Sequence, residues 1–532
     1  MWQRIILRGK ERTMLKRKST FMLMIALLCA GALLASCGPS APTPTDPDVT
    51  PAPSGPQEVI VALSGSPKAL CSWRGTSVGD QSVANLINFG LLQWDENLVI
   101  EPLAAKEILH PDETTIVFKL HEGILFHDGV EMTSADVKYT YDLIRDPDFA
   151  AQNRGFYTPI KEITTPDPYT VEFHLHEPSA PMLYYMSIGI MPKHIGEEHG
   201  EEWMEENAIG IGPYKLSEWV MEERIVIEAF DDCFWGRPEI DKITYRMIPE
   251  MATRVIELEA GSVHVIDWVA PEEVERLEDH ATVRLDISPG SGMNYLFANV
   301  EKAPLDDIRV RQALAYLFDQ TKMVEHILRG QGDYIYGPII PSSWAYHPDL
   351  PKYEFDVEKA KELLADAGYE DGLTLELSFF WEPFREMAEI LQYDFAQAGV
   401  TLEVKQVNSA LWYELSEAGD IELGIQGWRG QTDPDRGVYR QFHSDNRQPA
   451  GPNWSRYSNP EVDELLDKAR TVSDVEERKA IYWEIQEIVA EELPTIGYGG
   501  ADYVLSAHDK SLQNFHYSGW FYFRQLYQAW LE

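Results

Sequence analysis

Hydrophobic positions along the chain follow two periods, one typical of strands and one typical of helices. Apolar or alternating runs predict β-strands at residues 58–63, 114–120, 169–175, 225–229, 264–268 and 295–299. Apolar residues spaced three and four positions apart predict helices at residues 83–92, 250–260, 308–318 and 357–367. Because both patterns recur along the whole sequence, we expect an α/β protein.

The C-terminal half shows the order of the elements most clearly. Strands are expected at residues 374–380 and 401–407, with a helix at 384–398 between them. This β-α-β order predicts a sheet layered with helices. Two acidic helices, at residues 460–470 and 475–492, are expected to follow. The sequence shows no internal repeat and no interior low-complexity linker, so we expect any domains to be built from discontinuous segments.

The first part of the chain has the pattern of an export signal. A basic cluster at residues 16–18 precedes an apolar run at 21–34, which is shorter than the about 20 residues that span a bilayer. The run leads into residues 34–37 (Leu-Ala-Ser-Cys), which resemble a bacterial lipobox. We therefore predict that residues 1–37 are a lipoprotein signal peptide and that Cys37 is the lipidated N-terminus. An ordinary signal peptide or an uncleaved anchor is the alternative.

The segment that follows is expected to hold the folded part away from a membrane. Residues 38–57 are rich in Pro and Thr and cannot build a core, which predicts a disordered tether. The protein is thus expected outside the cytoplasm, at the cell surface or in the periplasm, anchored by its lipid. Met14 is an alternative start to Met1, because it gives the basic cluster its usual position.

The composition of the chain excludes two classes of binding partner and leaves open whether two cysteines form a disulfide. The chain has 87 acidic and 45 basic residues, a formal charge of −42, which argues against nucleic acid or an anionic membrane surface as a partner. Beyond the signal and lipid site, Cys71 and Cys233 remain. In an oxidising compartment they could form a disulfide, but two free buried thiols fit equally well.

Sequence motifs give no clear indication of catalysis or of metal binding. The chain contains no HExxH or CxxC pair and no Gly-rich nucleotide-binding loop. His174 and His176 share one face of a predicted strand, an arrangement that a structural role explains. We therefore expect no enzyme activity, no metal site and no cofactor. A secreted hydrolase with an Asp/Glu pair is the alternative from another class.

Aromatic residues in predicted loops indicate a binding role. Of 15 tryptophans, seven lie beside Gly, Pro, Ser, Asn or a charged residue: Trp73, Trp344, Trp381, Trp412, Trp428, Trp454 and Trp520. Flat aromatic side chains line binding clefts because they offer apolar area at little cost in rotamer entropy. The most prominent stretch is the Gly- and Pro-punctuated loop 427–435, after a predicted strand at 421–425. A plain surface turn is the alternative for this loop.

Several fragments occur in the order that a known family shows. They lie at residues 90–95, 117–120, 126–129, 136–137, 210–216, 235–241, 306–314, 356–369 and 457–466. Together, and behind a lipobox, they resemble the family 5 extracellular solute-binding proteins, the peptide- and nickel-binding group of bacterial ABC importers. The resemblance covers residues 58–531. It implies a periplasmic-binding-protein-like α/β fold, a two-lobed clamshell with an extra inserted domain.

The resemblance also implies the boundaries of these three lobes. Lobe I would consist of residues 58–101, 209–300 and 494–532, lobe II of 102–208, and lobe III of 301–493. Ligand would be enclosed between lobes I and III, and the closed form would be presented to a membrane permease. Such a protein performs no chemistry and depends on a difference in affinity between its open and closed states.

In relatives that bind peptides, a carboxylate three residues after the loop tryptophan pairs with the ammonium group of the ligand. That position is Gln431 here, and the first acid is Asp433, five residues after Trp428. Asp433 is expected either to replace the missing contact or to brace the loop while Gln431 binds a neutral polar ligand. Trp428 is expected in the wall of the pocket.

Other candidates for ligand contact follow from the same resemblance. They are Asn294 and Tyr295, at the start of a lobe-crossing strand, together with Trp381 and Trp412. Arg429 and Arg385 could pair with a ligand carboxylate in a two-pronged contact, although a surface or intraprotein contact is more typical of Arg429.

The resemblance predicts a monomeric, lipid-anchored receptor that delivers a short oligopeptide to an ABC permease heterodimer with its ATPase subunits. An oligosaccharide or another neutral solute is the alternative ligand, because stacking on tryptophan needs no ammonium partner. Nickel is less favoured, since no motif places a His cluster. A sensory role without transport is the alternative function.

Overall fold

The computed structural model describes residues 56–71, 73–74, 77–95, 99–149, 151, 154–429, 433–517 and 524–532. The predicted signal peptide, its Cys37 and the tether up to residue 55 lie outside these residues, as do Gln431 and Trp520. In the described part of the chain, no helix combines the length and the apolar character that crossing a membrane requires.

The largest sheet in the described residues has eleven strands. Ten of them follow one another in the order β15 (Val400–Gln406), β14 (Leu373–Phe379), β16 (Leu423–Arg429), β12 (Val283–Ala298), β17 (Thr495–Asp509), β11 (Val265–Ile266), β1 (Glu58–Leu63), β10 (Lys242–Met247), β9 (Arg224–Ala229) and β8 (Tyr214–Val220), and β13 (Gly332–Asp333) pairs with β17. The central pair, β12 and β17, joins the strands of the two ends of this sheet.

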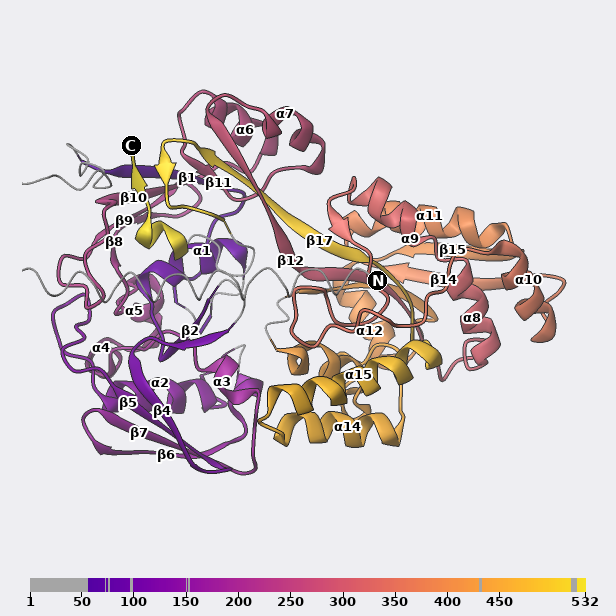
Figure 1. Cartoon of the computed structure of the whole chain (residues 1–532), viewed down its shortest axis with the longest axis horizontal. Coiled ribbons are helices and arrows are strands. Elements are labelled where there is room, and N and C mark those ends of the chain that lie inside the picture. Colours follow the sequence, from indigo (N-terminus) through magenta and orange to yellow (C-terminus); the bar gives the residue numbers. More distant parts are fainter. Residues whose placement is uncertain are drawn as a thin grey trace, which may run out of the picture. The chain divides into compact units, whose positions relative to one another are not determined.

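β12 and β17 are the longest strands, with 16 and 15 residues, and they run antiparallel side by side (Figure 1). Their register shifts between Pro289 and Met293. A Cβ atom on Gly290 in this segment would lie 2.1 Å from the carbonyl oxygen of Asp502, so only glycine allows the two backbones to approach this closely. The irregular segment separates the half of the pair beside β11 from the half beside β16.

A second sheet of four antiparallel strands forms around residues 105–175. Its order is β4 (Ala105–Asp112), β5 (Thr115–Leu120), β7 (Thr170–Leu175) and β6 (Ile160–Asp167). Helix α2 (Ser134–Arg145) packs on it, with Tyr141 edge-on to Phe173 at a centroid distance of 5.0 Å. The helix begins at Ser134, because the Asp136 carboxylate accepts a hydrogen bond from the backbone N–H of Thr133 at 2.8 Å and so caps the first turn.

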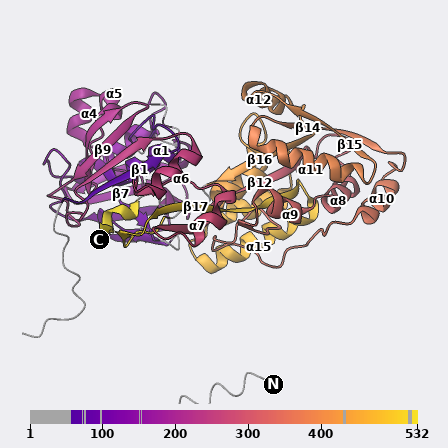
Figure 2. The same ribbon diagram turned by 90° about the horizontal axis from the view of Figure 1, so that it is seen from above.

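The predicted β-α-β unit of the C-terminal half is confirmed. β14 and β15 are parallel and are joined through α11 (Arg385–Ala396), which lies against the strands β14–β16 (Figure 2). Helix α11 buries Leu391 and Phe395 completely in a core shared with these strands. Burial of two such side chains contributes about 1.5–3 kcal/mol each.

The remaining elements of the described residues are helices and the strands of two two-stranded sheets. They are α1 (Val78–Ile87), β2 (Leu92–Trp94), β3 (Ile100–Pro102), η1 (Arg154–Tyr157), α3 (Met182–Tyr185), α4 (Lys193–His199), α5 (Glu201–Glu206), α6 (Met251–Glu259), η2 (Pro271–Glu273), α7 (Val274–Glu278), α8 (Ile308–Tyr316), α9 (Gln320–Lys322), η3 (Met323–Ile327), α10 (Val357–Asp366), η4 (Glu382–Phe384), α12 (Ser409–Ala418), η5 (Asp435–Tyr439), α13 (Arg440–Phe442), η6 (Ser444–Asn446), α14 (Pro460–Thr471), α15 (Val475–Glu492), β18 (Leu512–Gln513), η7 (Arg524–Gln528) and β19 (Trp530–Leu531).

Two predicted boundaries are wrong. The helix expected at residues 83–92 is α1, which begins at Val78 because Ser77 and Asp80 form a capping box there. The strand expected to end at residue 425 continues to Arg429, so Gly427, Trp428 and Arg429 belong to β16 and not to a loop. Pairing with β12 extends the strand, since Met293 lies opposite Trp428 in the ladder.

The structure answers the question of the disulfide, because Cys71 and Cys233 are both buried free thiols.

Candidate functional site

The ribbon formed by β12 and β16 carries several of the predicted site residues, but on opposite faces. Tyr295 lies opposite Gln426, and Met293 lies opposite Trp428. Because side chains alternate along a strand, these four residues share one face of the ribbon. Asn294 points to the other face, where its Oδ1 atom would be 2.9 Å from a Cβ atom on Gly427.

The first of these faces is aromatic. Tyr295 is buried beside Tyr498, with ring centroids 6.4 Å apart, and the half-buried Trp428 packs against the same cluster. Trp412 lies in this cluster with no exposed surface, in edge contact with Trp454 at 5.1 Å. The structure therefore places Trp412 in the core that supports the face, whereas Trp428 keeps part of its surface accessible.

Five buried polar atoms on or beside this face have no hydrogen-bond partner among the described residues. They are Tyr295 Oη, Gln426 Nε2, Trp428 Nε1 and both amide atoms of Gln441. A buried polar group left without a partner costs about 1–3 kcal/mol, so a ligand or water that pairs with these atoms would gain affinity. Tyr295 and Gln441 also line a small pocket.

The hydroxyl of Tyr295 and the amides of Gln426 and Gln441 are neutral hydrogen-bonding groups. Burial raises the pKa of the Tyr295 phenol far above its ordinary value, so this side chain stays a donor at any physiological pH. Gln441 offers both a donor and an acceptor. Together with the ring of Trp428, the face presents apolar area and unpaired polar atoms next to each other, as small-molecule sites do.

Asp433 is fully buried and its carboxylate is occupied. Arg478 donates to both of its oxygens, at 3.0 Å each, and the backbone N–H of Asp435 donates to Oδ1 at 3.0 Å. Arg478 is itself held by the carbonyl of Ala469 at 2.8 Å. This geometry favours the interpretation in which Asp433 braces the loop over the one in which it binds an ammonium group.

Asp435 lies next to Asp433 and has a different set of partners. Its Oδ1 lies 3.1 Å from Nε of Arg470, and the hydroxyl of Tyr185 donates to its Oδ2 at 3.4 Å. Burial raises the pKa of Asp435 to about 6, although the charge of Arg470 opposes this shift. Tyr185 belongs to α3, so the contact joins the segment after the four-stranded sheet to the C-terminal half.

The other predicted residues lie away from the aromatic face. Arg385 is paired with Glu382 at 2.7 Å, and Trp381, with 47% of its surface exposed, contacts Phe384 edge-on at 5.1 Å. Both residues lie near the start of α11, on the side to which Asn294 points. Arg429 lies at the end of β16 and makes an ion pair with Asp502 at 3.0 Å.

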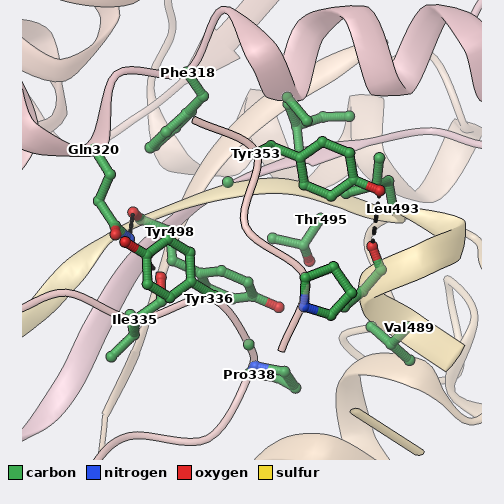
Figure 3. Close-up of a pocket in the computed structure, with 16 residues that line it drawn as sticks. Phe318, Gln320, Ile335, Tyr336, Pro338, Tyr353, Val489, Leu493, Thr495 and Tyr498 are labelled. Carbon is green, nitrogen blue, oxygen red and sulfur yellow. Dashed lines mark hydrogen bonds between the residues drawn. The ribbon is translucent and has the colours of Figure 1, made fainter. Parts of the chain in front are cut away.

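A second pocket lies between the α8–α9 region and the junction of α15 with β17 (Figure 3). Tyr336, Tyr353, Tyr498 and Phe318 contribute aromatic surface to it. Gln320 faces it, but its amide nitrogen already donates to the carbonyl of Tyr498 at 2.8 Å. None of the described residues that line this pocket carries a charged side chain, so these residues offer no group that would orient a charged ligand.

Among the described residues, no group of three or more His, Cys, Asp or Glu side chains is arranged to hold a metal ion. The residues that do converge are an aromatic and amide face with buried arginines beside it. Sequence reasoning did not identify Gln426 and Gln441 in this set. The two-residue spacing of Gln426 and Trp428 within a strand was the signal that could have identified Gln426.

Comparison with known proteins identifies the family. Residues 99–449 match the model described as "Bacterial extracellular solute-binding proteins, family 5 Middle". The chain belongs to this family. The oligopeptide-binding protein AppA of Bacillus subtilis is 28% identical over 509 residues, which cover 90% of this chain and 93% of AppA. The dipeptide-binding protein of Escherichia coli is 29% identical over 437 residues, covering 75% and 80% of the two chains.

A solved structure confirms the fold of this family 5 protein. HbpA2 from Haemophilus parasuis superposes with a TM-score of 0.82 at 23% identity, and the match covers 89% of this chain and 100% of HbpA2. The predicted periplasmic-binding-protein-like α/β fold is confirmed. Family 5 proteins are extracytoplasmic solute-binding receptors, which agrees with the expected receptor role and compartment.

Proposed function

We propose that this protein is the receptor of an ABC importer and that it binds a short oligopeptide at the aromatic face of β12 and β16. The observation that carries the proposal is the group of unpaired polar atoms around Trp428, on Tyr295, Gln426 and Gln441. A peptide backbone offers an N–H and a C=O at each residue, so amide side chains can pair with it whatever its sequence.

The relatives support this choice of ligand class. AppA is named an oligopeptide-binding protein and the E. coli relative a dipeptide-binding protein. The aromatic ring of Trp428 would supply contact area, and enclosure between the predicted lobes I and III would remove water from the polar contacts. The lobe boundaries given above remain part of the proposal.

Ligand-dependent stabilisation tests the peptide assignment. A ligand present at about 100 times its Kd stabilises the native state by about 2.7 kcal/mol, which for a protein of this size raises Tm by about 3 °C. We expect this rise with pools of di- to pentapeptides and no rise with oligosaccharides. Mass spectrometry of ligand that remains bound through purification would then name the peptide. A rise with oligosaccharides alone would contradict the assignment.

An oligosaccharide or another neutral solute is the second candidate. Two observations favour it: Asp433 is occupied by Arg478, and the face is built from tryptophan and amide side chains that also suit sugars.

A transport role and a sensory role are distinguished by deleting the permease genes. Loss of ligand uptake with ligand binding intact supports transport, whereas unchanged uptake supports a sensory role.

We also propose that Cys37 carries the lipid that anchors a monomeric receptor to the membrane, with residues 38–57 as its tether. The substitution Cys37→Ser should release the protein from the membrane fraction into the soluble fraction. Mass determination of the wild-type protein should show a diacylglycerol adduct at this residue. Membrane association that persists in Cys37→Ser would instead indicate an uncleaved anchor.

A further inference from the structure

The region beside Trp428 holds more cations than anions. Asp433 is paired with Arg478 at 3.0 Å, and Asp435 with Arg470 at 3.1 Å. In each pair, the negative charge of one carboxylate is balanced by the positive charge of one guanidinium group. Two further arginines, Arg436 and Arg440, follow directly in the helical segment η5–α13, four residues apart and therefore on neighbouring positions of one helical face.

All four arginines lie over aromatic rings, but Arg470 and Arg478 are also paired with a carboxylate. The guanidinium of Arg440 lies over the ring of Trp428, 5.4 Å from its centroid, and that of Arg436 lies 5.3 Å from the ring of Phe156. In the described part of the chain, no ion pair and no side-chain hydrogen bond engages either guanidinium. The nearby Asp435 is already paired with Arg470. The chain has 87 acidic residues, so the lack of a carboxylate paired with either of these two guanidinium groups is a local property and not a result of composition.

The environment of Arg440 makes its charge costly. Burial and the neighbouring charge of Arg436 lower the pKa of Arg440, while Tyr185 and Asp435 raise it. A partly buried cation is stabilised by an anionic partner that completes its hydrogen bonds. Arginine provides a planar fork of N–H donors that matches the two oxygens of a carboxylate.

The two arginines also lie where separate parts of the fold meet. Phe156, in η1, stacks on Tyr185 of α3 at a centroid distance of 4.4 Å, and Tyr185 donates to Asp435. The backbone N–H of Ala180 donates to the carbonyl of Arg470 at 2.7 Å and holds this segment against the C-terminal half. Residues from η1 and α3 and residues from the C-terminal half thus surround the two guanidinium groups. The guanidinium of Arg440 lies over the ring of Trp428.

We propose that Arg436 and Arg440 form a subsite for a carboxylate of the ligand, next to the aromatic face that holds its backbone. The proposal rests on the proposed function and specifies the ligand end that this protein selects. Such a subsite is cationic, whereas a site for an ammonium group is anionic. The carboxylates of the loop are not available for an ammonium group, because Arg470 and Arg478 already engage them. For a peptide, the carboxylate is that of its C-terminus, and for a non-peptide solute it is an acid group at the same place.

Matched peptide pools test the subsite by calorimetric or thermal-shift titration of the full chain. The probe is an equimolar pool of di- to pentapeptides of Ala and Gly in three forms: free acid, C-terminal amide, and N-acetylated free acid. Citrate and galacturonate serve as non-peptide carboxylates. The variants are Arg440→Gln, Arg436→Gln/Arg440→Gln and, as a control, Arg276→Gln, whose side chain is 48% exposed and paired with Glu273.

We expect the wild-type protein to bind the amide pool about 10- to 100-fold more weakly than the free-acid pool, and to bind the N-acetylated pool as tightly as the free acid. Arg436→Gln/Arg440→Gln should lose the preference for the free acid, and Arg276→Gln should keep it. Without ligand, the double variant should melt no earlier than the wild type, because it loses two like charges that lack ion pairs. This Tm shows that the variant is folded.

The other outcomes separate the subsite from the proposed function. Equal binding of acid and amide pools, unaffected by the double variant, overturns the subsite and leaves a peptide receptor. Loss of binding on N-acetylation alone also overturns it, in favour of ammonium recognition. Binding of citrate or galacturonate that depends on Arg440, with no peptide bound, supports the subsite and overturns the peptide assignment. Absence of binding to every probe overturns both.

Discussion

Replacing Asp433 with Asn removes one partner of a buried ion pair and leaves the other partner in place. The Arg478 guanidinium would lose two charge-assisted hydrogen bonds of 3.0 Å and would remain in the core as a charge without a counterion. Its side chain is 3% exposed, so water cannot replace the lost partner. Breaking a buried pair in this way costs about 3–5 kcal/mol.

Urea unfolding followed by tryptophan fluorescence measures this loss. We expect Asp433→Asn to unfold at a clearly lower urea concentration, and its affinity for the ligand, measured on the folded protein at low temperature, to stay within about fivefold of wild type. Asp445→Asn, whose side chain is 87% exposed, is the matched control and should unfold with the wild type. In a double-mutant cycle with Arg478→Met, the coupling energy should reach about 2 kcal/mol or more. Unchanged stability together with a hundredfold loss of affinity would refute a structural role for Asp433.

Three further predictions concern other residues of the described chain. Because burial raises the pKa of Asp435 to about 6, the native state binds a proton there between pH 7 and 5 that the unfolded chain does not. As the pH falls over this range, wild type should therefore gain about 1 kcal/mol of stability relative to Asp435→Asn, and equal Tm slopes against pH would contradict this. Gly290→Ala places a Cβ atom 2.1 Å from the carbonyl of Asp502 and should lower Tm by several degrees, whereas a wild-type Tm would show that the two strands can separate there without cost. Trp412→Ala should destabilise the fold by about 3–5 kcal/mol, while Trp428→Ala should lose about tenfold or more in ligand affinity with a smaller change in Tm; the reverse order would exchange their assigned roles.

Local signals in the sequence determine much of this fold. The helix at residues 475–492 was predicted at its observed bounds from its pattern of apolar residues. The structure shows that Asp474 caps its start. The parallel pair around α11 followed from element order alone, since a short β-α-β unit has few other arrangements.

The site depends on contacts between residues far apart in the chain, and the sequence does not encode these as a local pattern. The end of β16 was misplaced because its last residues are ordered by pairing with β12, about 130 residues earlier. The partner of Asp433 is 45 residues away, so a carboxylate beside a tryptophan was interpreted as a candidate for ligand contact. Asn294 and Tyr295 were grouped as neighbours, although alternation along β12 sends them to opposite faces.

The central claim is that ligand binds on the face of β12 and β16 that carries Tyr295, Gln426 and Trp428. A crystal structure of the full chain with its copurified or added peptide tests this most directly. We predict electron density in contact with the ring of Trp428 and within hydrogen-bonding distance of Gln426 or Gln441. Density confined to the pocket around Tyr336 and Tyr353, or to the opposite face beside Trp381, would contradict the account.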